Sequence, residues 1–130
     1  MRIIRIFVLS VLIFACTAIT AAASAEPMRG VWVSTVYNLD FPSRKSMSAS
    51  ELKAEIDNIV DDCASMGFNA VFFQVRPCAD ALYSSAIYPW SAVLSGTQGV
   101  APDGGFDPLA YWIEKCQSMG IELHAWINPY

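Results

Sequence analysis

A repeated five-residue motif places the strongest constraint on the fold of this 130-residue chain. The pattern Cys-x-Ser-Met-Gly occurs at 63–67 and again at 116–120, an offset of 53 residues. Each copy leads into an apolar stretch that ends in a polar residue and a proline, Arg76-Pro77 in one case and Asn128-Pro129 in the other. Glycine suits the end of a helix, because it adopts the left-handed backbone without penalty. The sequence therefore predicts one helix–turn–strand unit that is used twice.

Both copies follow segments that have the signals of amphipathic helices. The first helix is expected to begin after Ser48, because Ser48 and Glu51 have the spacing of a capping box. Its apolar face recurs at helical spacing, at Leu52, Ile56, Ile59, Val60 and Cys63. The second helix is expected to open at Asp107-Pro108, with aspartate as the N-cap and proline in the first turn. Gly67 and Gly120 are expected to end the two helices.

Three segments have the composition of β-strands, namely residues 29–36, 68–76 and 121–130. The second is apolar on both faces, as expected for a parallel strand that is covered on both sides. The order is then β-α-β-α-β, and strands separated by helices run parallel with right-handed crossovers. The predicted class is α/β, and two folds use this unit, the doubly wound open sheet and the (β/α)8 barrel.

The residues at the ends of the predicted strands favour the barrel. The turn after the first strand, residues 37–40, has no glycine-rich nucleotide-binding motif. Barrels instead collect polar and aromatic groups at the carboxyl ends of their strands, where their active sites lie. Such groups are present at all three strand ends: Thr35, Tyr37 and Asn38, then Gln74 and Arg76, then Trp126 and Asn128.

Two of these side chains, and His124 in the third predicted strand, have a structural alternative to a binding role. A buried arginine is costly unless it is paired or faces a polar cavity, so Arg76 is either half of an ion pair or part of a binding site. His124 is either a satisfied core histidine or a hydrogen-bonding member of the polar layer. Trp126 is either core filler or a platform for a sugar ring.

The segment 77–106 is a long irregular connection, where such loops usually have two to six residues, and long loops are often functional. It contains Asp80, Tyr83, Tyr88, Trp90 and Asp103. Aromatic rings stack on the apolar faces of sugars, and carboxylates accept hydrogen bonds from sugar hydroxyls. Alternatively, these aromatic residues only pin the loop to the rim of the barrel.

The first 25 residues resemble a secretory signal peptide. Two arginines precede an apolar stretch, and Ala-Ser-Ala at 23–25 is a small-residue cleavage site. A permanent membrane anchor is one alternative, and lipid attachment at Cys16 within a lipobox-like stretch is another. In each case we expect export to the periplasm or the cell exterior, with membrane contact only through the signal peptide or a lipid on Cys16.

Charge and cysteine content narrow the range of ligands. Residues 26–130 carry six basic and 12 acidic residues, a net charge of about −6, which disfavours nucleic acid and anionic membranes as partners. Three cysteines remain there, Cys63, Cys78 and Cys116, and they include no CxxC pair. This pattern argues against a disulfide framework or a zinc site, and we expect no metal and no cofactor. Cys63 and Cys116 are expected to be buried.

Three long motifs carry a resemblance to a known family. They are RGVWVSTVYNLDFPS, FNAVFFQVRPCADALYSSAIYPWSAVLSGTQG and FDPLAYWIEKCQSMGIELHAWINPY. Together they resemble the start of the bacterial glycosyl-hydrolase-like 10 family over about residues 28–130. The resemblance implies a (β/α)8 barrel related to retaining glycosidases, exported to the bacterial envelope, with cell-wall or other polysaccharides as substrates. A non-catalytic carbohydrate-binding barrel is the alternative, and a short protein that assembles from fragments is a third.

The resemblance also implies that this chain is the amino-terminal part of a longer domain. Glycosidases need two carboxyl groups, and related barrels place them on the fourth and seventh strands, so we expect the catalytic pair beyond Tyr130. Asp40 and Asp80 are the carboxylates near the expected barrel mouth, and substrate binding or loop structure is the favoured role for both. The chain alone is expected to be unstable and inactive. The candidate substrate-binding residues are Arg76, Gln74, Asn128, Trp126, His124, Tyr37, Asp80, Tyr83 and Trp90.

Overall fold

The structure, a computed structural model, describes residues 26–129. The predicted signal peptide and Cys16 lie outside these residues. The strands are β1 (Gly30–Val33), β2 (Ala70–Arg76) and β3 (Glu122–Ile127). The longer helices are α2 (Ala49–Ser65) and α4 (Pro108–Ser118), and the short elements are η1 (Val36–Asn38), α3 (Ala92–Ser95) and η2 (Asp103–Gly105). Within residues 26–129, no helix has the length and apolar character needed to cross a membrane.

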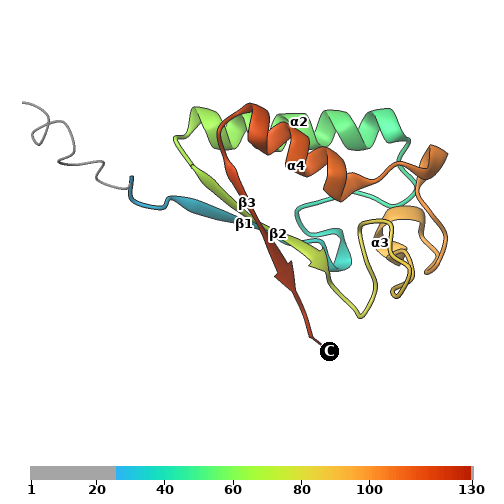
Figure 1. Cartoon of the computed structure of the whole chain (residues 1–130). Helices are drawn as coiled ribbons and strands as arrows, with labels where there is room; N and C mark the ends of the chain where they lie inside the picture. Colours follow the sequence, from blue (N-terminus) through green and yellow to red (C-terminus); the bar gives the residue numbers. More distant parts are fainter. Residues whose placement is uncertain (1–25, 130) are drawn as a thin grey trace, which may run out of the picture.

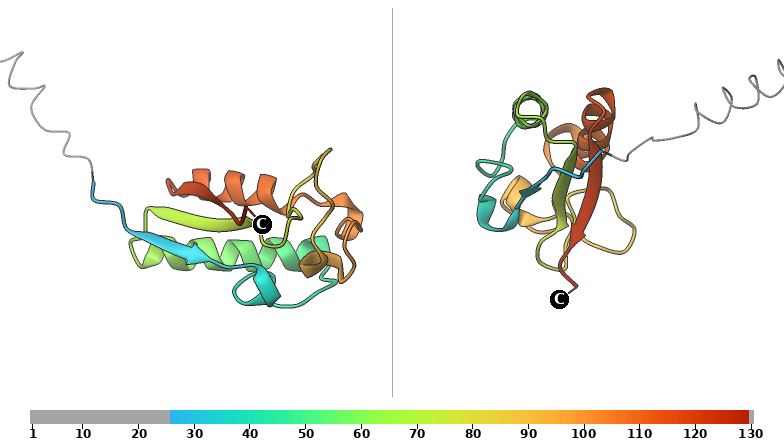
Figure 2. Two further views of the ribbon diagram at one scale, coloured as in Figure 1. Left: turned by 90° about the horizontal axis from the view of Figure 1, so that it is seen from below. Right: turned by 90° about the vertical axis from the view of Figure 1, so that its left-hand side faces the viewer.

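The three strands form one parallel sheet in the order β1-β2-β3. Helices α2 and α4 lie side by side on one face of this sheet, and within residues 26–129 no helix covers the other face (Figures 1 and 2). The predicted β-α-β-α-β order is therefore confirmed. Both the (β/α)8 barrel and the first half of a doubly wound sheet contain this arrangement, and the described strands form an open sheet.

The repeated motif forms the same turn at the end of each long helix. In the first copy the Phe68 amide donates to the Cys63 carbonyl at 2.9 Å, and the Gly67 amide donates to the Ala64 carbonyl at 3.0 Å. In the second copy the corresponding bonds are Ile121 to Cys116 at 2.9 Å and Gly120 to Gln117 at 3.1 Å. These pairs are the two bonds of a Schellman motif, with glycine at the left-handed position. The glycine φ angles are +79° and +69°.

The amino ends of both helices are capped as the sequence predicts. At α2 the Ser48 side chain accepts from the Glu51 amide, and the Glu51 carboxylate accepts from the Ser48 amide. These hydrogen bonds hold the pKa of Glu51 below its usual value. At α4 the Asp107 side chain accepts from the Ala110 amide, and Pro108 occupies the first turn. The boundaries of both helices thus follow from local chemistry.

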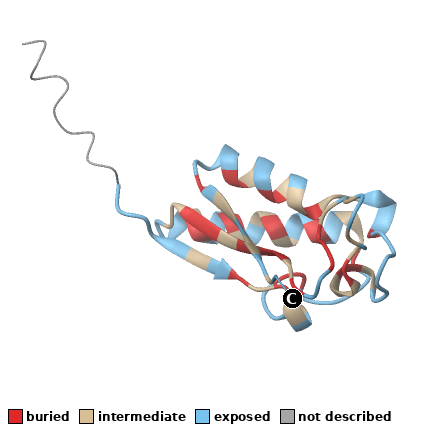
Figure 3. Ribbon diagram, turned by 60° about the horizontal axis from the view of Figure 1, so that its bottom comes forward, coloured by how far each residue is buried: buried red, intermediate tan, exposed pale blue. Residues whose placement is uncertain are grey.

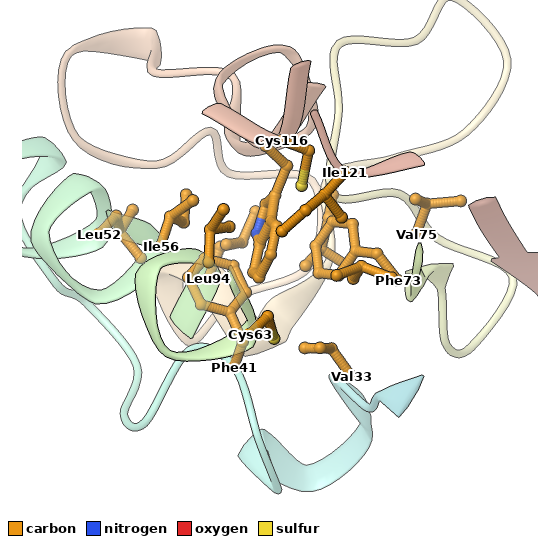
Figure 4. Packing of buried hydrophobic residues seen from close by; sticks show 14 of the residues in the cluster. Val33, Phe41, Leu52, Ile56, Cys63, Phe73, Val75, Leu94, Cys116 and Ile121 are labelled. Carbon is orange, nitrogen blue, oxygen red and sulfur yellow. The ribbon is translucent and has the colours of Figure 1, made fainter. Parts of the chain in front are cut away.

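The hydrophobic core lies between the helices and the sheet (Figure 4). Trp112 of α4 is fully buried, and its ring stacks on Phe73 of β2 at 4.7 Å and meets Phe41 edge-on at 5.6 Å. Cys63 and Cys116 are buried in the same cluster, as predicted. Figure 3 shows the buried positions concentrated along β2 and on the inner sides of the helices.

Two predictions about element boundaries were wrong. The first strand ends at Val33, not at residue 36, because the following backbone turns into η1 and bonds to a side chain of β2. The segment 77–106 is not wholly irregular. It contains α3 and η2, and Leu82 and Leu94 from this segment are buried in the core.

Candidate functional site

The carboxyl ends of the three parallel strands meet at one edge of the sheet, which we call the carboxyl edge. It comprises residues 34–40 after β1, residues 74–77 at the end of β2 and residues 126–128 at the end of β3. The segment 77–106 follows β2 at this same end of the molecule (Figure 1). The structure therefore brings together the strand ends that the sequence predicts to carry the site.

Gln74 fastens the exit of β1 to β2. Its Oε1 accepts from the backbone amides of Thr35 at 2.8 Å and Val36 at 2.9 Å. The Thr35 hydroxyl donates to the Gln74 backbone carbonyl at 2.9 Å. The Gln74 side chain is 1% exposed, and its Nε2 has no hydrogen-bond partner within the described residues. Gln74 thus has a structural role that the sequence did not reveal, and one free donor.

The turn after β1 is held rigidly by two further side chains. Asp40 accepts from the Ser34 amide at 2.7 Å, and Asn38 donates to the carbonyls of Pro42 at 2.8 Å and Val93 at 3.0 Å. Tyr37, between them, has a φ of +55° and is 88% exposed. The turn therefore displays an aromatic ring to solvent at the carboxyl edge.

Asn128 joins the end of β3 to the end of β2. Its backbone amide donates to the Arg76 carbonyl at 3.0 Å, and its Nδ2 donates to the Pro77 carbonyl at 3.0 Å. Its Oδ1 accepts from the Trp126 indole at 3.0 Å, so the orientation of the indole is fixed. Gln74 and Asn128 act alike, because each binds the backbone that leaves the preceding strand.

An aromatic layer covers the sheet face opposite the helices. Trp32, Phe72 and His124 are cross-strand neighbours in this layer, and Trp126 lies two residues farther along β3, opposite Gln74. Phe72 stacks on Trp32 at 4.7 Å and on His124 at 4.9 Å, and Trp126 meets Trp32 edge-on at 5.2 Å. His124 Nε2 also lies 3.2 Å from the Glu122 carboxylate. His124 is only half-buried, so it is not an enclosed core histidine in the described part of the chain.

Arg76 lies half-buried at the end of β2, next to Asn128 along the edge. Its guanidinium carbon is 3.6 Å from the centre of the Tyr88 ring, which is a cation–π contact. Its Nε is buried without an acceptor, and none of the ion pairs within residues 26–129 includes it. Sequence analysis left two alternatives for Arg76, an ion pair or a binding site, and the described residues do not form the ion pair.

The remaining candidates lie in the segment that follows β2. Asp80 is buried, and its carboxylate accepts from the Cys78 amide at 3.0 Å, so this group shapes the loop. Tyr83 and Trp90 are partly buried against the core. The backbone of the segment is pinned by bonds from Leu82 to Val75 and from Ser91 to Ala81. These two aromatic residues therefore anchor the loop, and a sugar-stacking role for them stays a prediction.

The displaced pKa values among the described residues belong to side chains of the long helices α2 and α4. Burial raises the pKa of Cys116 to about 11 and also raises the pKa of Cys63. Burial and a hydrogen bond to Asp57 raise the pKa of Tyr111, and a bond to Asp61 raises the pKa of Lys115. Residues 26–129 contain no group of three or more metal-ligating side chains. The chemistry of the described carboxyl edge comes from its hydrogen-bonding and stacking groups.

Sequence reasoning missed Trp32 and Phe72 as members of the aromatic layer. The alternation of side chains along GVWV and AVFFQVR places both on the helix-free face, so the signal was present. It also missed the contacts of Ser34 and Asn38 in the first turn, whereas loop structure was one of the two roles expected for Asp40. No sequence pattern indicates those contacts, because they depend on the path of the chain after β1.

Comparison with known proteins supports a single relationship. The family model of glycosyl hydrolase-like 10 matches residues 27–129. The glycosyl hydrolase YngK of Bacillus subtilis is 48% identical over 109 residues, which cover 84% of this chain and 21% of YngK. The glycosyl hydrolase DigH of Escherichia coli K12 is 40% identical over 119 residues, which cover 85% of this chain and 26% of DigH.

The chain thus spans about a fifth to a quarter of the length of these curated relatives. Its family match covers β1 to β3, both long helices and the whole carboxyl edge. On this match, the chain belongs to the glycosyl hydrolase-like 10 family.

Proposed function

We propose that this chain supplies the first strands of a (β/α)8 glycoside hydrolase that acts on a bacterial cell-wall or other polysaccharide. The observation that carries this proposal is the concentration of aromatic and hydrogen-bonding side chains at the carboxyl edge of a glycosyl hydrolase-like chain. In (β/α)8 enzymes the active site lies at this end of the strands. The names of the relatives, both glycosyl hydrolases, support the reaction class.

The carboxyl edge has the chemistry that a sugar-binding surface needs. Tyr37 offers an exposed aromatic ring on a hydrogen-bonded turn, and the hydrogen bond from Trp126 to Asn128 fixes the orientation of the indole. Arg76 offers a half-buried guanidinium that no ion pair within residues 26–129 engages. Sugars present both apolar C–H faces and hydroxyl groups, so alternating rings and donors suit them. In this proposal Gln74 and Asn128 keep these groups in place more than they contact the glycan.

The proposal places the catalytic carboxyl pair outside residues 26–129. Glycosidases use an acid and a nucleophile or base, which lie about 5 Å apart in retaining enzymes and farther apart in inverting ones. Asp40 and Asp80 are each bound to a backbone amide of their own loop, which suits a structural role. The greater length of the relatives is consistent with carboxylates supplied by later strands. Residues 26–130 alone are then expected to be inactive.

The proposal includes export to the bacterial envelope. Its support is the sequence of residues 1–25, which has the order of a secretory signal peptide. Mass spectrometry of the protein from its own cell envelope tests this: a mature chain that begins at Glu26 is expected. A lipid on Cys16 would favour the lipoprotein alternative, and an intact Met1 would contradict export by cleavage.

The direct test uses the complete gene product and purified polysaccharides, including cell-wall glycan strands. New reducing ends and shortened chains are expected. Tight glycan binding without new reducing ends would instead support the non-catalytic binding alternative. If the protein neither binds nor cleaves any polysaccharide of a broad panel, both the hydrolase proposal and the binding alternative are contradicted.

A matched pair of surface variants tests whether the carboxyl edge is the binding surface. Tyr37→Ala removes an exposed ring at that edge and is expected to weaken glycan binding about tenfold, the scale of one lost aromatic contact. Met119→Ala removes an exposed apolar side chain at the opposite end of the sheet, and binding is expected to stay unchanged. Equal effects of the two variants would place the binding surface elsewhere.

A further inference from the structure

Arg76 differs from the other two arginines of the described chain in its partners. Arg29 lies 3.9 Å from the Glu26 carboxylate, and Arg44 pairs with Glu51. Both of these arginines are on the exposed surface, where pairing is least needed. Arg76 is more buried than either, yet it pairs with no carboxylate within residues 26–129. An unpaired cation in this setting indicates a position reserved for an anion.

The geometry of the guanidinium leaves one side open to such an anion. Tyr88 covers one face of the group, with the guanidinium carbon 3.6 Å from the ring centre. Nε is buried and has no acceptor, so this edge is closed by protein. The two Nη atoms are not among the buried unpaired atoms, and no acceptor within residues 26–129 engages them. Two parallel N–H donors at the tip of arginine match the two oxygens of a carboxylate.

The surroundings of Arg76 hold its backbone in place. The Arg76 carbonyl accepts from the Asn128 amide at 3.0 Å, and the carbonyl of Val75 accepts from the Leu82 amide at 3.0 Å. Gln74, two residues earlier on β2, contributes a second buried donor without a partner, Nε2. Donors that are fixed before the ligand arrives lose little entropy when it binds, which favours affinity.

We propose that Arg76 receives a carboxylate at the carboxyl edge, through a two-pronged contact from its Nη atoms. This inference rests on the proposed function for its ligand: the carboxylate belongs to an acidic sugar of the bound glycan. The carboxylate that binds Arg76 could instead be supplied by a later part of the protein. The two sources of the carboxylate give different results when the charge of the glycan is changed.

The test measures binding of two tetrasaccharides to the complete gene product by calorimetry. One is an acidic cell-wall tetrasaccharide, and the other is the same molecule with its carboxyl groups converted to amides. The wild-type protein is expected to bind the acid at least about tenfold more tightly than the amide, the scale of a charged hydrogen bond. Arg76→Gln should abolish this preference, and Arg76→Lys should restore only part of it because lysine lacks the planar fork. Arg44→Gln is the matched control and should retain the full preference.

If the carboxylate belongs to the protein itself, the affinities and the pH profile change in a different way. Arg76→Gln then weakens binding of both tetrasaccharides equally and shifts the pH profile of kcat/KM. That result supports the carboxylate partner and assigns it to the protein. Unchanged binding and an unchanged pH profile in Arg76→Gln would overturn the inference and leave Arg76 as a packing partner of Tyr88.

A failure of the proposed function can be distinguished from a failure of the inference about Arg76. If the complete protein binds neither tetrasaccharide, the glycan assignment is wrong for this class of polymer. A crystal structure of the complete protein then decides the inference. A protein carboxylate in contact with the Arg76 Nη atoms would support it, and Nη atoms facing only solvent would overturn it.

Discussion

The two ends of the sheet are built on different principles. At the amino end, the turns from α2 to β2 and from α4 to β3 have the same sequence motif, the same two hydrogen bonds and the same left-handed glycine. At the carboxyl end, the exits of β1 and β2 have no sequence motif in common. Gln74 holds the backbone after β1 and Asn128 holds the backbone after β2, and the connections that follow these strands, residues 34–48 and 77–107, differ in length.

The difference is the one expected if the carboxyl end carries the proposed binding site. Both amino-end turns connect the end of a helix to the start of the next strand, and both do so with the same Schellman motif. At the carboxyl end, Gln74 and Asn128 each bind the backbone of the preceding strand's exit, but no sequence motif repeats. The same end carries aromatic rings and Arg76, which forms no ion pair within residues 26–129. In barrels, residues at the carboxyl face of the strands serve catalysis, and those at the opposite face serve stability. The contrast here is the one expected for the proposed barrel.

The largest effect on stability is expected from Gln74→Leu at the carboxyl end. Leucine keeps the bulk of the side chain but removes the acceptor for the amides of Thr35 and Val36. Two N–H groups without an acceptor are expected to lower the free energy of unfolding by about 2–5 kcal/mol. Denaturant unfolding of the complete gene product measures this loss.

The matched control for Gln74→Leu is Gln117→Leu, on the exposed outer side of α4. A surface change of this kind should alter the free energy of unfolding by no more than about 0.5 kcal/mol. If both substitutions cost the same, Gln74 does not hold the exit of β1, and the account of the carboxyl end is wrong.

A smaller effect is expected from the buried thiol of Cys116 at the amino end. Burial raises its pKa from an ordinary 9.0 to about 11, so the folded protein favours the neutral thiol. The resulting stabilisation is complete below pH 9 and is lost as the pH rises toward 11, by roughly 2–3 kcal/mol. The difference in unfolding free energy between wild type and Cys116→Ala should shrink over this window. A difference that stays constant over this pH window would contradict the assignment to Cys116.

The smallest effect is expected from the two repeated glycines. Gly67→Ala and Gly120→Ala each introduce a side chain at positive φ, and no atom lies within 4 Å of the added carbon. The cost is therefore backbone strain alone, about 1 kcal/mol for each. The two losses in unfolding free energy should be equal within error, and glycan affinity should stay unchanged. A change in affinity from either variant would break the division between the two ends.

The fold was largely predictable because its signals are local. The capping box at Ser48, the N-cap at Asp107 and the glycines at 67 and 120 each act within a few residues, and all four are confirmed. The end of β1 was not predictable. It depends on the side chain of Gln74, 39 residues after Thr35, and no local pattern encodes that contact.

The candidate site was predictable only as a location. Strand order and alternation indicated that Gln74, Arg76, Trp126 and Asn128 would share one edge, and they do. Their individual contacts were not predictable, because hydrogen bonds between side chains and distant backbone depend on the assembled fold. Asn128 illustrates this, since it uses its amide to bind Pro77 and Trp126.

The central claim is that the glycan binds at the carboxyl edge. Hydrogen–deuterium exchange of the complete gene product, with and without a bound oligosaccharide, tests this most directly. The account predicts slower exchange in residues 34–40 and 77–91 and no change in the amino-end turns at 66–69 and 119–122. Protection of the amino-end turns, with none at 34–40 or 77–91, would contradict it.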